Sequence, residues 1–250
     1  MRSIVIQSPL EFRAEVPGDS FPQGAQVPCT LTVKNHGPAP VVLSQLALRL
    51  ALGSLKKVKA KDPSAFAVLA EGEIERGSEV APGAELSFRH TFALDVNGAI
   101  SDKSQSPYVL FGNAENEATL GQMLLTVHPH PYVRSVFDSL TTVFSFINKG
   151  ETWKEGLTTA KLKAPDAKRF SMVDELNLSC SFDGEALLVS YLFSVKKFEN
   201  VLVKAQVKRG KAEVSQRWER TDYTFGDGFI RQEFVEKMVD EALATVSTGF

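Results

Sequence analysis

The sequence predicts a mainly β protein made of two antiparallel β-sandwich lobes, joined by an amphipathic helix and closed by a C-terminal helix. Three observations support this fold class. Apolar and polar residues alternate through many short runs that Gly, Pro, Asn and Asp bound, which is typical of half-buried antiparallel strands. After Pro131 the apolar residues recur every three or four positions, which is a helical period. A second helical run occupies the C-terminal end.

The first lobe is predicted over residues 1–128, and no helical run interrupts its strands. Several short strands without helices favour a sandwich. The predicted strands are the runs "SIVIQSPLEFRAEV", "AQVPCTLTVKN", "VVLSQLALRLAL", "FAVLAEGEI", "AELSFRHTFAL", "SPYVLFGNA" and "GQMLLTV".

The connecting helix is predicted over Pro131–Asn148. Pro131 suits the first helical turn, where its missing N–H is not needed. Gly150 can adopt the left-handed conformation that ends a helix. The predicted packing face consists of Val133, Val136, Phe137, Leu140, Val143, Phe144 and Ile147.

The second segment, residues 129–250, contains this helix, a smaller antiparallel sheet and the C-terminal helix. Asp183-Gly184 between two alternating runs predicts a β-hairpin. A second hairpin is predicted to turn at Arg209-Gly210-Lys211. Asp227 is the predicted N-cap of the C-terminal helix. Its apolar residues Phe234 and Met238 are candidates for self-association.

Composition is that of an ordinary globular protein, with 43% hydrophobic and 23% charged residues among 250. The formal net charge of −2 gives no indication of nucleic-acid binding. No apolar run reaches the ~20 residues that cross a bilayer, and the N-terminus lacks the pattern of a secretory signal. We therefore expect a cytoplasmic protein, with Cys29 and Cys180 as buried, reduced thiols.

No catalytic, phosphate-binding or dinucleotide-binding motif is present, and we expect neither an enzyme nor a cofactor. Asp174 and Glu175 would point to opposite faces of a strand, which disfavours a joint acid–base role. His128 and His130, on either side of a proline, could be two metal ligands. No nearby acidic or cysteine cluster completes such a site, so a joint between the lobes is the favoured interpretation.

Two surfaces are candidates for binding a partner. Lys56, Lys57, Lys59 and Lys61 form either a solvated loop or a docking point for an acidic protein or an anionic headgroup. The stretch over residues 59–77 is predicted to hold an open sheet edge, with Pro63 blunting one end. An extended peptide can add a strand to such an edge.

The order of these segments resembles the arrestin-type β-sandwich. "FPQGAQVPCTLTVKN" and "VVLSQLALRL" are similar to that fold's opening strands, and Pro82-Gly83 leads into an aromatic-rich strand with Phe88 and Phe92. "HPYVRSVFDSL" and "DELNLSCSFDGEALLVSYLFSVKKF" resemble the later segments of the bacterial sporulation-control family. The resemblance covers roughly residues 1–200 and implies a regulatory role in a bacterial cell.

These observations predict a non-catalytic cytoplasmic adaptor, scaffold or regulator. Its protein partners would bind through sheet edges and through the cleft between the lobes. The first alternative is a self-assembling structural protein that associates through its C-terminal helix. An enzyme or a carrier of a small ligand is the second alternative.

Overall fold

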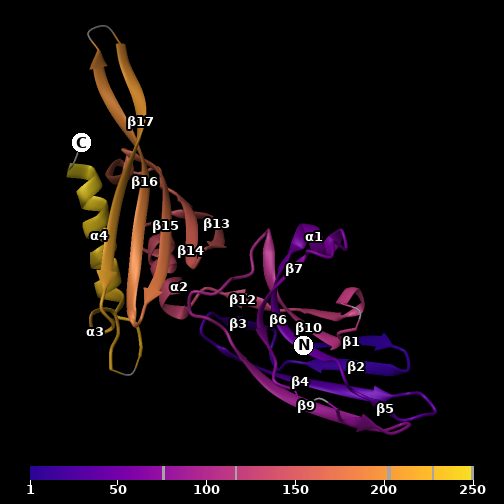
Figure 1. Cartoon of the computed structure of the whole chain (residues 1–250). Helices are drawn as coiled ribbons and strands as arrows, with labels where there is room; N and C mark the ends of the chain where they lie inside the picture. The colour runs from indigo at the N-terminus through magenta and orange to yellow at the C-terminus, as the bar shows by residue number, and fades with distance from the viewer. Residues whose placement is uncertain (75–76, 116, 202–203, 227, 249–250) are drawn as a thin grey trace. The chain divides into compact units, whose positions relative to one another are not determined.

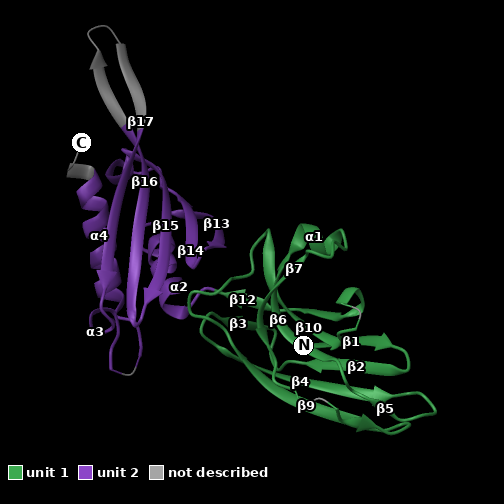
Figure 2. Ribbon diagram, in the orientation of Figure 1, with its two compact units in different colours: residues 1–128 green, residues 129–250 purple. Residues whose placement is uncertain are grey.

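The computed structural model describes residues 1–74, 77–115, 117–201, 204–226 and 228–248 (Figure 1). The chain divides into two compact units, Met1–His128 and Pro129–Phe250 (Figure 2). The predicted mainly β fold with antiparallel main sheets and a C-terminal helix is confirmed. No helix in the described ranges is long and apolar enough to span a membrane.

Unit 1 contains two four-stranded sheets, in the orders β1-β2-β4-β9 and β11-β10-β6-β7. Two short two-stranded sheets, the parallel pair β12-β3 and the antiparallel pair β5-β8, complete the unit. The strands are β1 Arg2–Gln7, β2 Leu10–Glu15, β3 Ser20–Pro22, β4 Gln26–Asn35, β5 Val41–Val42, β6 Leu46–Ser54, β7 Phe66–Glu71, β8 Glu79–Val80, β9 Glu85–Ala93, β10 Gln105–Asn113, β11 Gly121–Leu124 and β12 Thr126–His128. The short helices are α1 Leu55–Lys59 and η1 Glu117–Thr119.

The two sheets of unit 1 pack face to face, as the predicted sandwich requires. Phe12 and Leu31 from one sheet and Leu48 and Val109 from the other belong to the same buried cluster. β2 shows why its sequence forms such a strand, because Leu10, Phe12 and Ala14 are buried while the residues between them are half-buried. Inward and outward positions alternate along a strand, so one apolar set faces the core.

Unit 2 contains one five-stranded antiparallel sheet, in the order β13-β14-β15-β16-β17. Helices α2 and α4 contact each other and pack on one face of it, with their buried residues in the same core. The elements are α2 Pro131–Thr142, β13 Ile147–Lys154, β14 Leu157–Lys163, η2 Lys168–Phe170, β15 Val173–Asp183, β16 Ala186–Val201, β17 Lys204–Trp218, α3 Arg220–Tyr223 and α4 Gln232–Thr248.

This second lobe departs from the predicted pair of sandwiches, because helices rather than a second sheet cover its core. The physical reason lies in its two amphipathic helices. Val136, Phe137 and Leu140 of α2 and Val235 and Val239 of α4 are fully buried. Their apolar faces supply the second layer that a sandwich would take from another sheet.

Helix α2 begins at Pro131 as predicted but ends at Thr142, not Asn148. Ser145 takes a left-handed conformation, with φ 57°, and redirects the chain. Gly150 lies in β13, at a register shift, instead of ending the helix. Of the predicted packing residues beyond Thr142, Phe144 is buried, whereas Val143 and Ile147 are 49% and 51% exposed, because the chain has left the helix.

Of the two hairpin turns predicted in unit 2, one is confirmed and one is wrong. The turn at Asp183-Gly184 is confirmed, since Asp183 pairs with Ala186 and Gly184 has a positive φ of 61°. The turn predicted at Arg209-Gly210-Lys211 is wrong, because Gly210 pairs with Val195 inside the β16–β17 ladder. Both flanking runs alternate without a break, which favours one long strand over a turn. The predicted cap Asp227 lies outside the described residues.

Candidate functional site

Strand β7 is an open edge of the unit 1 sandwich. It is the last strand of its sheet and pairs with β6 alone. Val68 and Leu69, in its middle, are 49% and 52% exposed. Within the described ranges, none of the backbone hydrogen bonds outside the ladders involves residues 66–71. The outer N–H and C=O groups of β7 are thus free to pair with an added strand.

Both ends of β7 are anchored. At its start, the ring of Phe66 meets Tyr108 edge to face, with centroids 5.3 Å apart. Gly53 leaves room for these rings, because a Cβ there would lie 2.6 Å from Tyr108. At its end, Arg49 Nε lies 2.9 Å from a carboxylate oxygen of Glu71. β7 is therefore held at both ends, and its exposed middle has a register shift at Leu69, between the Val68–Ala51 and Ala70–Leu50 pairs.

The four lysines predicted as a binding surface lie next to the start of this strand in the chain. Lys56, Lys57 and Lys59 are on α1, so the predicted loop contains one helical turn. All four side chains are exposed, with Lys61 just beyond the turn. Across the described part of the chain, none of them lies within ion-pair distance of a carboxylate.

The segment between α1 and β7 is fixed by local hydrogen bonds. The Asp62 carboxylate accepts bonds from the backbone N–H and the hydroxyl of Ser64, both at 2.8 Å. These bonds lower the pKa of Asp62 and keep it ionised. Lys57 Nζ donates to the Ser64 hydroxyl at 3.0 Å, which brings one lysine close to the start of β7.

The opposite edge of the same sheet is closed. β11 lies beside β1 of the facing sheet, and the hydroxyl of Ser3 donates to the carbonyl of Gln122 at 3.3 Å. The side chain of Gln7 accepts a bond from the backbone N–H of Asn113 at 2.6 Å and donates to the Thr119 hydroxyl at 2.6 Å. The sandwich is therefore joined along this side, and its second sheet is open at β7.

Among the described residues, His128 and His130 do not belong to a cluster of three metal-ligating side chains. His130 is the N-cap of α2, and its Nδ1 accepts the N–H of Tyr132 at 3.2 Å. Its ring also meets Phe182 edge on, with centroids 4.7 Å apart. Burial lowers the pKa of His130, which keeps the ring neutral and able to accept this bond. His128 is exposed at the end of β12.

The predicted self-association residues, Phe234 and Met238, pack against the core of unit 2. Phe234 meets the Trp218 ring edge on, with centroids 5.5 Å apart. The backbone carbonyl of Met238 accepts a bond from Gln216 at 2.9 Å. The apolar face of α4 is thus packed on its own sheet, and self-association through this helix stays a prediction.

The two thiols and the paired acidic residues have structural positions. Cys29 and Cys180 are buried and free, as predicted, and burial raises the pKa of Cys29 to about 12. Asp174 pairs with Lys196 at 2.7 Å, while Glu175 pairs with Lys161 at 3.2 Å. The two carboxylates therefore have separate partners, which gives them no shared acid–base role.

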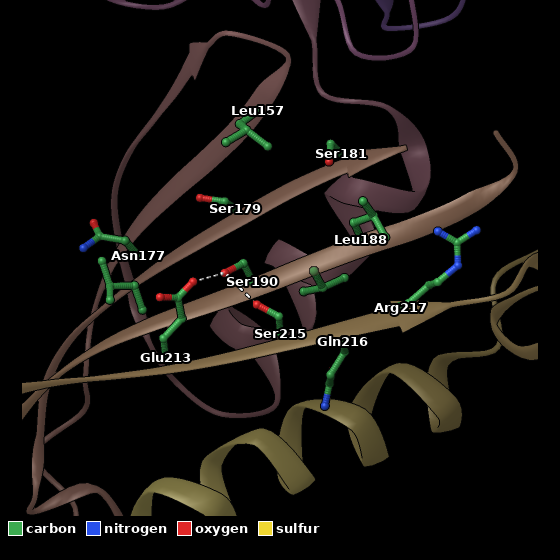
Figure 3. Close-up of a pocket in the computed structure, with 12 residues that line it drawn as sticks. Leu157, Asn177, Ser179, Ser181, Leu188, Ser190, Glu213, Ser215, Gln216 and Arg217 are labelled. Atoms are coloured by element: carbon green, nitrogen blue, oxygen red, sulfur yellow. Dashed lines mark hydrogen bonds between the residues drawn. The ribbon is translucent and has the colours of Figure 1, made fainter. Parts of the chain in front are cut away.

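Sequence reasoning missed a hollow of about 600 Å³ on the helix-free face of the unit 2 sheet (Figure 3). Thr159, Ser179, Ser190 and Ser215 lie opposite one another on four neighbouring strands. Thr159 and Ser179 are hydrogen-bonded at 2.9 Å, and Ser215 donates to Ser190 at 3.3 Å. Alternating serines in "LNLSCSF" and "LLVSYLF" indicated polar strand faces, but the row across strands depends on register. The row thus contains two hydroxyl pairs, and Ser190 donates in turn to the Glu213 carboxylate at 3.4 Å.

Comparisons with known proteins identify a shared fold. No family model matches the chain, and no curated protein matches it. The crystal structure of Spo0M, a sporulation control protein from Bacillus subtilis, matches with a TM-score of 0.66. That match has 16% identity and covers 96% of this chain and 99% of Spo0M.

A DNA-bound alkylpurine DNA glycosylase from Pseudomonas fluorescens, AlkC, matches with a TM-score of 0.29 and 14% identity. That match covers 47% of this chain and 30% of the glycosylase, too little to indicate a common fold. The likeness to Spo0M spans both units. The fold of this protein is therefore that of a bacterial sporulation control protein, as the sequence resemblance predicted.

Proposed function

We propose that this protein is a non-catalytic cytoplasmic adaptor or regulator that binds an extended segment of a partner protein along β7. The observation that carries the proposal is the anchored, apolar, open edge of β7, preceded in the chain by four exposed lysines. Spo0M, which has the same fold, is a sporulation control protein, and this supports a regulatory role here.

The backbone supplies the affinity in this mode of binding. A strand added to a sheet edge forms a ladder of main-chain hydrogen bonds, and pockets or exposed side chains select its sequence. β7 is already extended, so little conformational entropy is lost on its side. Its short length of six residues and the register shift opposite Leu50 limit unwanted pairing. Its exposed Val68 and Leu69, by contrast, favour pairing with an apolar segment.

The lysines supply the selectivity and the rate of association. Lys56, Lys57, Lys59 and Lys61 are exposed and lack carboxylate partners among the described residues. Clustered positive charge raises the rate at which an acidic segment arrives and is screened by salt. The preferred partner segment is thus apolar in its middle and acidic where it meets α1. A partner between the two lobes stays a prediction.

The test is a comparison of three tagged proteins used to capture partners from a native lysate, read by mass spectrometry. Leu69→Lys places a charge in the middle of β7. Val42→Lys is the matched control, because Val42 is 55% exposed on β5, away from the edge. We expect the parent chain and the control to retain the same proteins, and Leu69→Lys to lose them.

A second arm replaces all four lysines by Gln. We expect captured proteins to dissociate at lower salt from this variant than from the parent. Retention of the same proteins by Leu69→Lys, or no captured protein at all, would count against the proposal. Equal thermal unfolding of all variants shows that each is folded.

A further inference from the structure

We infer that β7 also pairs with β7 of a second copy of this chain, antiparallel and about a two-fold axis. This inference rests on the proposed function, because it uses the same open edge and names one segment that fits it. The pairing would join two four-stranded sheets edge to edge. Three features support the pairing: the charge pattern of the segment, its apolar middle, and a geometry that limits the assembly to two copies.

The charge pattern of the segment is complementary to itself. Four lysines precede β7, and Glu71 and Glu73 lie at and just beyond its end, all of them exposed. In an antiparallel pair, the start of one strand lies beside the end of the other. The lysine-bearing start of each copy then lies beside the acidic end of the other, where Glu71 already pairs with Arg49 and Glu73 adds a second carboxylate. A parallel pair would place like charges together.

The middle of the strand is apolar and self-matching. Ala67, Val68 and Leu69 are all exposed in the single chain. A two-fold axis perpendicular to the joined sheets places one central residue opposite itself, and the register shift at Leu69, between the Val68–Ala51 and Ala70–Leu50 pairs, lies next to that axis. Such an isologous contact buries the same apolar patch on both copies.

The assembly closes at two copies. The contact uses one edge of each sheet, and the other edge, β11, is joined to β1 through Ser3 and Gln7. An isologous contact about a two-fold axis uses the same edge of both copies, so the pairing closes at two and does not propagate into a filament.

Cysteine cross-linking tests the geometry. Residues directly opposite in an antiparallel pair have Cα atoms about 4.5–5.5 Å apart, within the range of a disulfide. Val68→Cys and Leu69→Cys are introduced singly, and both native cysteines are buried and unreactive. With copper phenanthroline as the oxidant, we expect a covalent dimer from at least one of them. Val42→Cys is an exposed control that stays monomeric.

Sedimentation of the full chain tests the energetics. We expect a dimer whose dissociation constant rises roughly tenfold or more with Leu69→Lys, because two added lysines face each other across the axis. Added salt weakens the parent dimer and has less effect when the four lysines are Gln.

Two results would overturn the inference, and they separate it from the proposed function. A parent chain that stays monomeric at high concentration, with no cross-link at residue 68 or 69, rejects the second copy as occupant. If Leu69→Lys still loses lysate partners, β7 binds another protein and the proposed function stands. If Leu69→Lys also keeps those partners, both proposals fail together.

Discussion

β7 in unit 1 and β17 in unit 2 both end an antiparallel sheet, yet their exposed side chains differ. On β17, Lys211, Glu213 and Arg217 are exposed at alternate positions. On β7, Ala67, Val68 and Leu69 occupy the exposed middle without a charge among them. Charged side chains discourage edge pairing, while apolar ones favour it. Both units therefore have an open sheet edge. Charged side chains protect the β17 edge from pairing, whereas apolar side chains make the β7 edge suitable for binding.

The inward side of each strand differs as well. β17 ends at Trp218, which is fully buried and contacts Phe234 of α4. β7 is fixed mainly at its ends, by Phe66 and Glu71. The inward side chains of β17 thus pack on the core of unit 2. β7 is fixed by contacts at its two ends, and its middle residues are exposed.

The largest expected loss of stability comes from β17, whose last residue is buried in the core of unit 2. Trp218→Ala removes a fully buried ring and should destabilise the protein by ~3–5 kcal/mol. Phe66→Ala removes a half-buried ring and should cost about 1–2 kcal/mol. Chemical denaturation of both variants measures the difference. Equal losses would contradict the view that the two edges are held differently.

A smaller effect is expected where β7 is anchored. Gly53→Ala forces a Cβ against Tyr108 and Phe66 and should destabilise by ~1–3 kcal/mol. Because the start of β7 shifts with these rings, binding along the edge should weaken too. Gly77→Ala is a poor control, since its φ of 86° makes any side chain strained. Gly226→Ala is a better control and should change neither stability nor binding, because a Cβ there meets nothing within 4 Å and the residue has no positive φ.

The smallest change in stability should come from making β17 resemble β7. Lys211→Val with Glu213→Val removes one charge of each sign, so the net charge is unchanged. Stability should stay within ~0.5 kcal/mol, as for most surface substitutions. Light scattering should nevertheless detect new self-association through the apolar edge. The same two positions changed to Gln stay polar and should not associate. Association of the Gln variant would show that charge does not protect β17.

Much of the local structure was predictable because periodicity reports directly on burial. Alternation identified most strands of unit 1, the start of α2 at Pro131 and the Asp183-Gly184 turn. The run "SIVIQSPLEFRAEV" was read as one strand but forms the β1–β2 hairpin. Its two halves have the same alternation, so the pattern did not show the turn at Ser8-Pro9.

The two parts of the candidate site, the lysines and the sheet edge, were predicted separately. The lysines and the edge around "FAVLAEGEIERG" were both identified from the sequence as separate surfaces. That they form one surface follows from α1, whose single turn leads through the Asp62–Ser64 contacts into β7. His130 and Phe234 were candidates for other roles; both are half-buried, with ring contacts to Phe182 and Trp218, and self-association through Phe234 stays a prediction.

The sequence by itself determined which residues face inward, because alternation along a strand and spacing along a helix record burial one element at a time. The tertiary structure alone decided which strands lie at an edge, because pairing joins segments distant in the chain. β10 pairs with β6 and β11, which leaves β7 open, and Gln7 reaches Thr119 to close the opposite side. Whether an apolar strand is a core strand or a binding edge thus depends on neighbours that its own residues do not specify.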